Sequence, residues 1–226
     1  MCGRFVVGEP DPALWADWLG VPVDGPWPEA RWNLAPTQEI AILRDGDEGR
    51  RLDRARWGLV PHWWRKPLAE MKASTFNARS EDAATKPMFS DAWKRGRCLV
   101  PAIGYYEWTG RKGAKQPWFV TFRTNAPGIC FAGLWAFARP EDRPEGLLSV
   151  TILTCDAGRA TAHLHPRCPV ILEEGDWARW LEPGSEAADL MRAPEDGRVE
   201  AWPVDPAVGR VANEGPELVA RQGLGI

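Results

Sequence analysis

The stretch CLVPAIGYYEW, residues 98–108, decides the class of fold because it predicts two short strands in succession, 98–101 and 103–108. Three more segments of strand length, each bounded by turn-forming residues, follow at 118–123, 129–135 and 149–154. Successive strands without a long helix between them are typical of a largely antiparallel sheet and not of alternating βαβ units. The centre of the chain is therefore predicted to be a sheet.

Outside this centre the sequence predicts more strands and only short helices. The additional strands are expected at 3–7, 39–44, 51–57, 170–172 and 199–204. Short helices are expected from Asp11-Pro12 to Gly20, and at 90–95, 156–164 and 176–181. We predict an α+β fold with one domain over residues 1–226. Its mostly antiparallel sheet has a barrel-like core with peripheral helices, and the chain becomes irregular from about residue 205.

Composition limits the classes of protein to be considered. The chain has 226 residues, of which 44% are apolar, which is enough for one sizeable core. No apolar run approaches the roughly 18 residues of a membrane helix, and no signal peptide is recognisable. Five cysteines without close pairing favour reduced thiols over a disulfide framework. We expect a soluble, cytoplasmic protein without membrane contact.

The charges of the chain are unevenly distributed, although its net charge is only −3. Residues 50–115 contain 15 Lys and Arg against 6 Asp and Glu, whereas the remainder is strongly acidic. Trp57, Trp63, Trp64, Trp93 and Trp108 lie in this basic stretch, and single-stranded nucleic acid stacks on aromatic side chains that alternate with cations. The alternatives are a solvated charged face and tryptophans that belong to the core.

Cys2 follows the initiator methionine directly, so removal of Met1 would leave a free amine beside a thiol. Model α-amino groups titrate near ~8 and thiols near ~8.5, so both are partly nucleophilic at neutral pH. Such a 1,2-aminothiol condenses with an aldehyde to an imine and then closes a five-membered thiazolidine. The alternative is that Cys2 is an ordinary residue near a frayed terminus.

Glu107, in the sequence Tyr105-Tyr106-Glu107-Trp108, is the second candidate for chemistry. Strand alternation puts Tyr105 and Glu107 on one face, and a carboxyl group among aromatic side chains is desolvated, which suits it to proton transfer. The alternative is an exposed glutamate on an edge strand.

His163 and His165, together with Cys155 and Cys168, have a spacing that matches none of the common zinc sites. We therefore predict no metal site, and we predict that a single histidine, His165, acts as an acid or base. His163 can be structural.

The chain also lacks GxGxxG, P-loop, HExxH and nucleophile-elbow motifs, so no cofactor is expected. Asn77 and Arg79 are predicted to lie in a loop. The alternatives to a functional role are that Asn77 is a turn residue and that Arg79 is a surface cation.

Six segments together resemble the SRAP family, the SOS response-associated peptidase domain. They are Met1-Cys2-Gly3-Arg4-Phe5, Arg31-Trp32-Asn33-Leu34-Ala35-Pro36, Trp57-Gly58-Leu59-Val60-Pro61, Asn77-Ala78-Arg79-Ser80-Glu81, Glu107-Trp108 and Leu164-His165-Pro166-Arg167-Cys168-Pro169. The resemblance covers nearly the whole chain, in order.

This resemblance implies a protein that binds abasic sites in single-stranded DNA and crosslinks to them through its N-terminal cysteine. It implies Cys2 as the nucleophile, with Asn77, Glu107 and His165 as the other catalytic residues. It further implies six DNA-binding residues, namely Arg4, Trp63, Trp64, Arg79, Trp108 and Arg167. Family members are also credited with removing their own initiator methionine. Cys168, where relatives more often carry methionine, and Gly209, where they often carry asparagine, depart from the pattern.

Three functions are thus open at the level of the sequence. The first is a monomeric abasic-site protein that forms a thiazolidine crosslink in the DNA damage response, with lyase-like chemistry, in the cytoplasm and at the bacterial nucleoid when bound to DNA. The second is a peptidase or amidohydrolase in which the Cys2 amine serves as base for its own thiol. The third is a non-catalytic module for single-stranded DNA.

Overall fold

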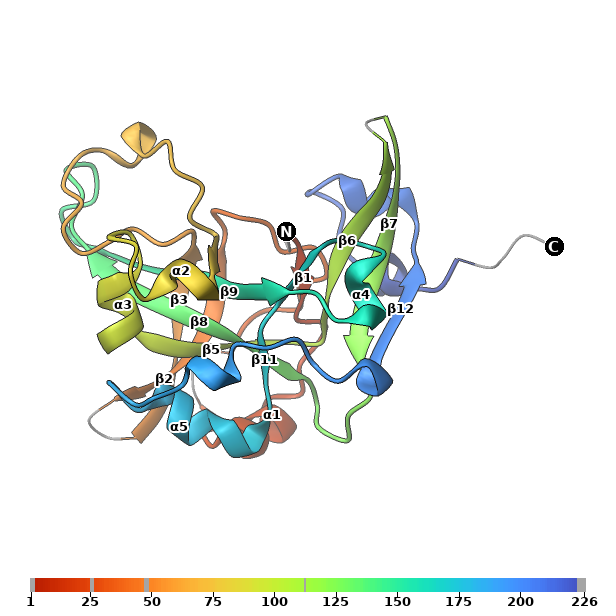
Figure 1. Ribbon diagram of the computed structural model, residues 1–226, viewed down its shortest axis with the longest axis horizontal. Coiled ribbons are helices and arrows are strands. Elements are labelled where there is room, and N and C mark those ends of the chain that lie inside the picture. Colours follow the sequence, from red (N-terminus) through yellow and green to blue (C-terminus); the bar gives the residue numbers. More distant parts are fainter. Residues whose placement is uncertain (1–2, 25–26, 47–48, 112, 223–226) are drawn as a thin grey trace.

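The computed structural model of the protein describes residues 3–24, 27–46, 49–111 and 113–222 (Figure 1). The described strands are β1 (Phe5–Val6), β2 (Glu39–Gly46), β3 (Gly49–Trp57), β4 (Asn77–Arg79), β5 (Arg97–Ala102), β6 (Gly104–Arg111), β7 (Ala114–Phe122), β8 (Ile129–Ala138), β9 (Leu147–Asp156), β10 (Arg167–Pro169), β11 (Ile171–Leu172) and β12 (Val199–Pro203). The α-helices are α1 (Pro12–Leu19), α2 (Ser80–Ala83), α3 (Ser90–Arg95), α4 (Arg159–Ala162) and α5 (Trp177–Leu181). Short 3-10 helices lie at Leu68–Glu70, Glu174–Asp176, Ala188–Leu190, Asp196–Arg198, Pro206–Gly209 and Pro216–Val219.

Five strands close into a barrel in the order β9–β3–β2–β5–β8, with β8 pairing back to β9. Three further strands, β4, β10 and β11, extend the edges of this sheet. All six residues of β5 are buried, and so are seven of the ten in β9. Such continuous burial fits strands that are covered on both faces. The predicted barrel-like core is confirmed.

A second, antiparallel sheet has the order β1–β6–β7–β12. Phe5 in β1 joins it to the barrel, because its ring packs edge-to-face on Trp57 of β3 at 5.1 Å and on Phe131 of β8 at 5.8 Å between ring centres. Phe5 is fully buried. The first described residues of the chain therefore lie where the two sheets meet, at β1 in Figure 1.

The predicted strands are present. Most of them extend beyond the predicted ranges, whereas those predicted at 3–7, 170–172 and 199–204 are shorter in the structure. Two parallel pairings were not anticipated, β3 with β9 and β4 with β9. The loop predicted around Asn77 is wrong, since Asn77–Arg79 forms strand β4. A three-residue strand is too short to show an alternating pattern, and its backbone hydrogen bonds to β9 are non-local, which explains the error.

Helix α1 begins and ends where local chemistry predicts. The Asp11 carboxylate accepts hydrogen bonds from the N–H groups of Ala13 and Leu14 at the start of α1, and Gly20 ends the helix with φ of 68°. The helix predicted over 156–164 shrinks to α4, because Asp156 still belongs to β9.

The segment after residue 205 consists of 3-10 turns that pack on the second sheet. Val208 and Leu218 are buried in a small cluster with Val6, Tyr106 and Phe119. The irregular C-terminal segment therefore contributes to the core.

In the described part of the chain no helix is long and apolar enough to span a membrane; the longest α-helix, α1, has eight residues.

Candidate functional site

The N-terminal strand lies directly beside the strand that carries Glu107. Phe5 is opposite Tyr105 in the β1–β6 pairing, and the Tyr106 N–H donates to the Arg4 carbonyl oxygen at 2.9 Å. Antiparallel pairing continued by one residue brings Gly3 level with Glu107. Cys2, the predicted nucleophile, lies outside the described residues.

Glu107 is buried, with 5% of its surface exposed. Its strand β6 runs between β1 and β7, so the alternative of an exposed edge-strand glutamate is wrong. Tyr105 belongs to the main core and Tyr106 to the small second cluster, which confirms that the two faces of β6 alternate. Glu107 therefore shares the face of Tyr105 that is turned toward the barrel.

The end of β9 brings Asn77, Arg79 and Arg167 together from distant parts of the chain. Thr154 pairs with Arg79 of β4 and with Pro169 of β10, so these two strands flank opposite edges of β9. The buried Thr154 hydroxyl donates to the Ala78 carbonyl oxygen at 3.4 Å. Asn77 is half-buried and Arg79 is exposed.

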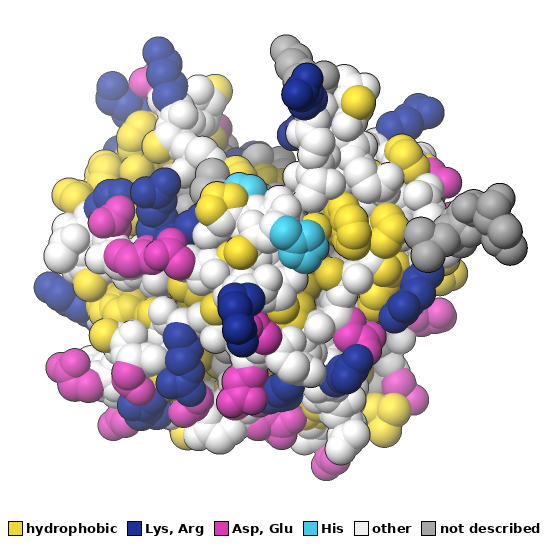
Figure 2. Space-filling model, turned by 45° about the vertical axis from the view of Figure 1, so that its right-hand side comes forward, with side chains coloured by type: hydrophobic (Ala, Val, Ile, Leu, Met, Phe, Trp, Pro, Cys, Tyr) yellow, Lys and Arg dark blue, Asp and Glu magenta, His cyan; other side chains and the backbone are white. Residues whose placement is uncertain are grey.

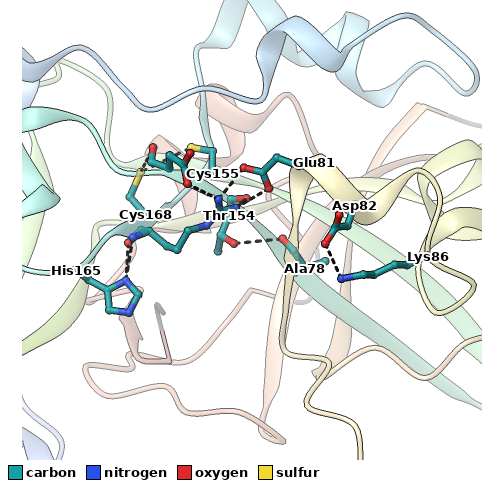
Figure 3. Close-up of polar contacts among 10 residues, drawn as sticks. Ala78, Glu81, Asp82, Lys86, Thr154, Cys155, His165 and Cys168 are labelled. Atoms are coloured by element: carbon teal, nitrogen blue, oxygen red, sulfur yellow. Dashed lines mark hydrogen bonds and ion pairs between the residues drawn. The ribbon is translucent and has the colours of Figure 1, made fainter.

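His165 lies at the entrance to β10 and is half-buried. Its Nδ1 accepts a hydrogen bond from the Arg167 backbone N–H at 2.9 Å. Because Nδ1 is an acceptor, the proton of the neutral ring is on Nε2. Figure 3 shows His165 in one cluster with Glu81 and Thr154, which come from α2 and β9. The backbone thus sets the tautomer and orientation that an acid or base requires.

His163 connects the histidine segment with the sheet that carries Glu107. Its ring lies edge-to-face on Trp118 at 5.9 Å, with an interplanar angle of 89°. Trp118 is the cross-strand partner of Glu107 and lies on the same face. The Trp118 indole N–H donates to the Thr109 hydroxyl at 3.0 Å, which orients the ring. The structural alternative for His163 fits this contact.

Within the described ranges, no group of three or more His, Cys, Asp and Glu side chains is arranged to hold a metal ion.

Arg4 lies on the opposite face of the second sheet from Glu107. Its Nη1 donates to the Asn33 side-chain oxygen at 2.6 Å and to the Val208 carbonyl oxygen at 2.8 Å. The guanidinium carbon lies 5.8 Å from the centre of the Trp108 ring. Burial lowers the pKa of Arg4 from its ordinary value. Two predicted DNA-binding residues, Arg4 and Trp108, are therefore neighbours.

Arg167 is engaged by carboxylates. Its guanidinium makes a two-pronged ion pair with Glu81 at 2.7 and 2.8 Å and a third contact with Asp156 at 2.7 Å. The hydrogen bond from Arg167 lowers the pKa of Glu81, and in return Glu81 raises the pKa of Arg167. Arg167 thus ties β10 to α2 across β9, and its role in DNA binding stays a prediction.

Trp63 and Trp64 lie in the long loop between β3 and β4. Trp63 is exposed by 45%, and the two rings are 6.2 Å apart at their centres. The loop is anchored by the Glu141 N–H, which donates to the Arg65 carbonyl oxygen at 2.7 Å. An exposed aromatic ring on an anchored loop is suited to stacking on a base.

Two projections flank β1 in Figure 1, the loop 61–75 on one side and the β6–β7 hairpin on the other. Exposed cations occur on both, among them Arg65 and Lys72 on the loop and Arg111 and Lys115 on the hairpin. Figure 2 shows Lys and Arg side chains near the ends of two projections, with a hollow between them. Some of the basic residues of the central sequence thus lie on one projection and some on the other. A further basic residue of this stretch, Arg97, is buried.

Sequence reasoning missed three residues that build the site: Asn33, Trp118 and Glu81. Asn33 is fully buried and donates through Nδ2 to the carbonyl oxygens of Val208, Arg210 and Asn213. Its only sequence signal was its place in the motif Arg31-Trp32-Asn33-Leu34-Ala35-Pro36 of the family resemblance. Glu81 was part of a motif of the family resemblance but was assigned no role, and Trp118 gave no signal, because their partners Arg167 and His163 are far away in the chain.

Comparison with known proteins agrees with this geometry. The chain is 36% identical over 234 residues to the abasic site processing protein YedK of Escherichia coli, covering 97% of this chain and 99% of the relative. It is 31% identical over 230 residues to the abasic site processing protein YoqW of Bacillus subtilis, with coverages of 97% and 99%. A crystal structure from Bacteroides thetaiotaomicron has the same fold, with a TM-score of 0.85, 21% identity and coverages of 98% and 100%.

A second crystal structure, from Bordetella bronchiseptica, matches with a TM-score of 0.79 at 29% identity and covers 90% of this chain and 100% of that one. The model of the SOS response associated peptidase (SRAP) family matches residues 1–211. The match spans both sheets and all four catalytic candidates of the sequence, and the chain therefore belongs to the SRAP family.

Proposed function

We propose that this protein binds single-stranded DNA and forms a thiazolidine crosslink between Cys2 and the aldehyde of an abasic site. The observation that carries the proposal is the buried carboxyl group of Glu107, which lies in the strand that pairs with β1, the first described strand of the chain. The relatives YedK and YoqW are named abasic site processing proteins, which supports the same substrate class.

The first step is opening of the sugar ring. An abasic deoxyribose is mostly a closed hemiacetal, and its opening requires that a proton leave the anomeric hydroxyl and another reach the ring oxygen. Glu107 is suited to this transfer, because its carboxyl group is shielded from bulk water. The product is a free aldehyde at C1′ of the sugar.

The second step joins protein and DNA. Once Met1 is removed, the Cys2 amine adds to the aldehyde and water leaves, which yields an imine. The thiolate then adds to the imine carbon, the nitrogen takes up a proton, and the five-membered ring closes. His165, with its proton on Nε2, can supply a proton to the departing oxygen, and Asn77 can orient the amine or the sugar oxygen.

The DNA strand is proposed to pass between the two projections. Trp63 offers an exposed ring for stacking, with Trp64 beside it, and Arg79 offers an exposed cation to a phosphate. Arg4 and Trp108 form a neighbouring cation and ring on the other face of the second sheet, for an adjacent nucleotide. Arg167 is assigned a positioning role through β10 in addition to any contact with DNA.

The test uses single-stranded DNA with one abasic site, analysed on a denaturing gel. We expect a slowly migrating covalent species with the processed protein. Cys2→Ala should abolish the stable species, and so should an acetylated N-terminus, because the ring needs the amine and the thiol together. Absence of the species with protein whose Met1 is proven to be removed would contradict the proposal.

The same preparations distinguish the other two functions. Repeated turnover of peptide substrates would favour the peptidase, whereas a single cleavage after Met1 fits self-processing only. DNA binding that is unaffected by Cys2→Ala, with no covalent species in any sample, would favour the non-catalytic module. The proposal itself implies a monomer that meets its lesions in the cytoplasm, on nucleoid DNA.

A further inference from the structure

Two buried cysteines lie opposite each other at the edge of the barrel sheet. Cys168 of β10 is the register partner of Cys155 of β9, and the two sulfur atoms are 3.7 Å apart. Figure 3 shows the two side chains pointing toward one another, beside the cluster that contains Glu81 and His165. The four cysteines in the described ranges are free thiols.

The other two thiols provide an internal comparison. Cys98 lies opposite Gly133, and Cys130 lies opposite Pro101 and Leu172, so neither faces another cysteine. Burial raises the pKa of both. They belong to β5 and β8, two strands of the closed barrel.

The surroundings of Cys168 favour its thiolate. The pKa of Cys168 is lowered, first by the hydrogen bond from the Cys155 thiol, and further by the Gly158 backbone N–H and the charge of Arg167, against the effect of burial. The pKa of Cys155 is raised, because its proton is held in the bond to Cys168. As a neutral thiol, Cys168 can donate to the Asp156 carbonyl oxygen at 3.8 Å. The pair thus contains one nucleophilic sulfur and one that keeps its proton.

We propose that Cys155 and Cys168 form a redox modification site, at which a hydroperoxide oxidises the pair to a disulfide. The proposal rests on the register and on the sulfur separation, and it is independent of the proposed DNA chemistry. In a disulfide the sulfur atoms are about 2.05 Å apart, so a shift of less than two ångström between them is sufficient. Strand β10 has only three residues and forms the edge of its sheet, so small displacements there disturb few neighbours.

The electrons and atoms balance in two steps. The Cys168 thiolate attacks the O–O bond of the peroxide, becomes a sulfenic acid, and releases hydroxide or an alkoxide, which takes up a proton. The Cys155 sulfur then attacks the sulfenic sulfur, the S–S bond forms, and water leaves with the thiol proton. The two thiols lose two electrons, and these reduce the peroxide.

The backbone pairing sets the distance that a disulfide between Cys155 and Cys168 has to span. Val170 N–H donates to Leu153 O, and Ala157 N–H donates to Pro166 O, so opposite residues two positions away on either side are hydrogen-bonded pairs. Cys168 and Cys155 therefore occupy a hydrogen-bonded position, where the Cα atoms are further apart than in the alternate pairs. Such a pair is roughly 5.5 Å apart at Cα, which lies within the range that disulfides span, so the bond can form between the paired strands.

The test treats Cys2→Ser protein with stoichiometric hydrogen peroxide, so that the N-terminal thiol does not compete. After unfolding, the remaining thiols are alkylated and the protein is digested with trypsin. Cleavage after Arg123, Arg159 and Arg167 puts Cys155 and Cys168 in separate peptides, 124–159 and 168–179. We expect these two peptides to be linked, to have lost two hydrogens in total, and to separate after dithiothreitol, while Cys98 and Cys130 stay fully alkylated.

Variants of the two cysteines test which sulfur reacts with the peroxide first. Cys155→Ser should stop at a sulfenic acid on Cys168 that a cyclic diketone probe captures, and Cys168→Ser should leave Cys155 unmodified. Cys130→Ser is the matched control, since Cys130 lies in the same tryptic peptide as Cys155, and the link should form as in the parent protein. Oxidation of Cys98 or Cys130 in step with the pair, or sulfinic acid on Cys168 without the link, would overturn the proposal.

Discussion

Glu107 is a buried residue for which we also propose a chemical role. Replacement by Gln keeps the size of the side chain and its place in β6 but removes the carboxyl group that we propose transfers protons. We expect Glu107→Gln to slow crosslinking by about 10²–10⁴-fold, because one acid–base step is typically worth that much. The rate is measured with processed protein and abasic single-stranded DNA on denaturing gels.

The binding of undamaged single-stranded DNA provides the control for this variant. Its affinity should stay within about twofold of the parent, since the buried carboxyl group does not face the phosphates. A matched exchange at the exposed Glu145 should leave both quantities unchanged. If Glu107→Gln lowered DNA affinity and crosslinking by the same factor, the assignment of Glu107 to proton transfer would be wrong.

Glu81 is a residue whose role concerns stability. The hydrogen bond from Arg167 lowers its pKa below the ordinary value of 4.5. A lowered folded-state pKa stabilises the fold fully above the unfolded-state value and loses this effect as the pH falls through the folded-state value. The Glu81 side chain is 50% exposed, so we expect only roughly 0.5–1 kcal/mol.

The direction of the pKa shift of Glu81 determines the expected result. Glu81→Gln should lower the thermal midpoint near neutral pH. The difference from the parent protein should begin to shrink as the pH falls below ~4.5 and vanish only below the lowered folded-state pKa of Glu81, where both side chains are neutral. Melting curves from acid to neutral pH measure it. A difference that grows toward acid pH would refute the assignment.

At the scale of elements, one buried side chain attaches the C-terminal turns to the second sheet. Asn33 accepts from Arg4 and donates to three carbonyl oxygens of the segment 208–213. Asn33→Asp keeps the size of the side chain and the contact to Arg4 but removes the donors and brings an anion to three carbonyl oxygens. We expect it to lower the free energy of unfolding by roughly 1–3 kcal/mol, measured by urea denaturation.

Asn213 offers the matched control, because it is only partly buried and donates once, to the Ala207 carbonyl oxygen at 2.7 Å. Asn213→Asp should lower the free energy of unfolding clearly less than Asn33→Asp does. Equal losses in both variants would mean that the effect arises from charge in this segment and not from the buried donors of Asn33.

The arrangement of elements also explains which site residues could be foreseen. The faces of β6 followed from local alternation, so Glu107 was recognisable before the fold was known. Asn77 was recognised but assigned to a loop, because β4 exists only through its pairing with β9. The contact of His163 with Trp118 joins α4 to β7, and no local pattern predicts such a contact.

For the whole molecule, the two basic projections predict how DNA affinity depends on salt. Lys72 lies on the loop 61–75 and Lys115 on the β6–β7 hairpin, and both are exposed. If each contacts a phosphate, Lys72→Gln and Lys115→Gln should each reduce the slope of log K against log salt concentration by about 0.7 for single-stranded DNA. Titrations by fluorescence anisotropy at several salt concentrations measure this slope.

Arg179 on α5 is the control for general charge effects. In Figure 1 α5 lies at the opposite end of the molecule from the two projections. Arg179→Gln removes one positive charge as well, and we expect the salt slope to stay unchanged. A similar reduction in all three variants would argue against a DNA path between the projections.

The sequence by itself determined the short strands, the capped helix α1, the α+β class and the candidate residues, because these depend on local periodicity and on side-chain chemistry. Tertiary structure alone decided the closure of the barrel through β8 and β9, the parallel pairing of β4, and the packing of the segment after 205. It also decided that Arg167 lies between carboxylates and that Cys155 faces Cys168. The physical reason is that hydrogen bonds between strands and ion pairs between distant residues leave no periodic signal along the chain, whereas burial of one face does.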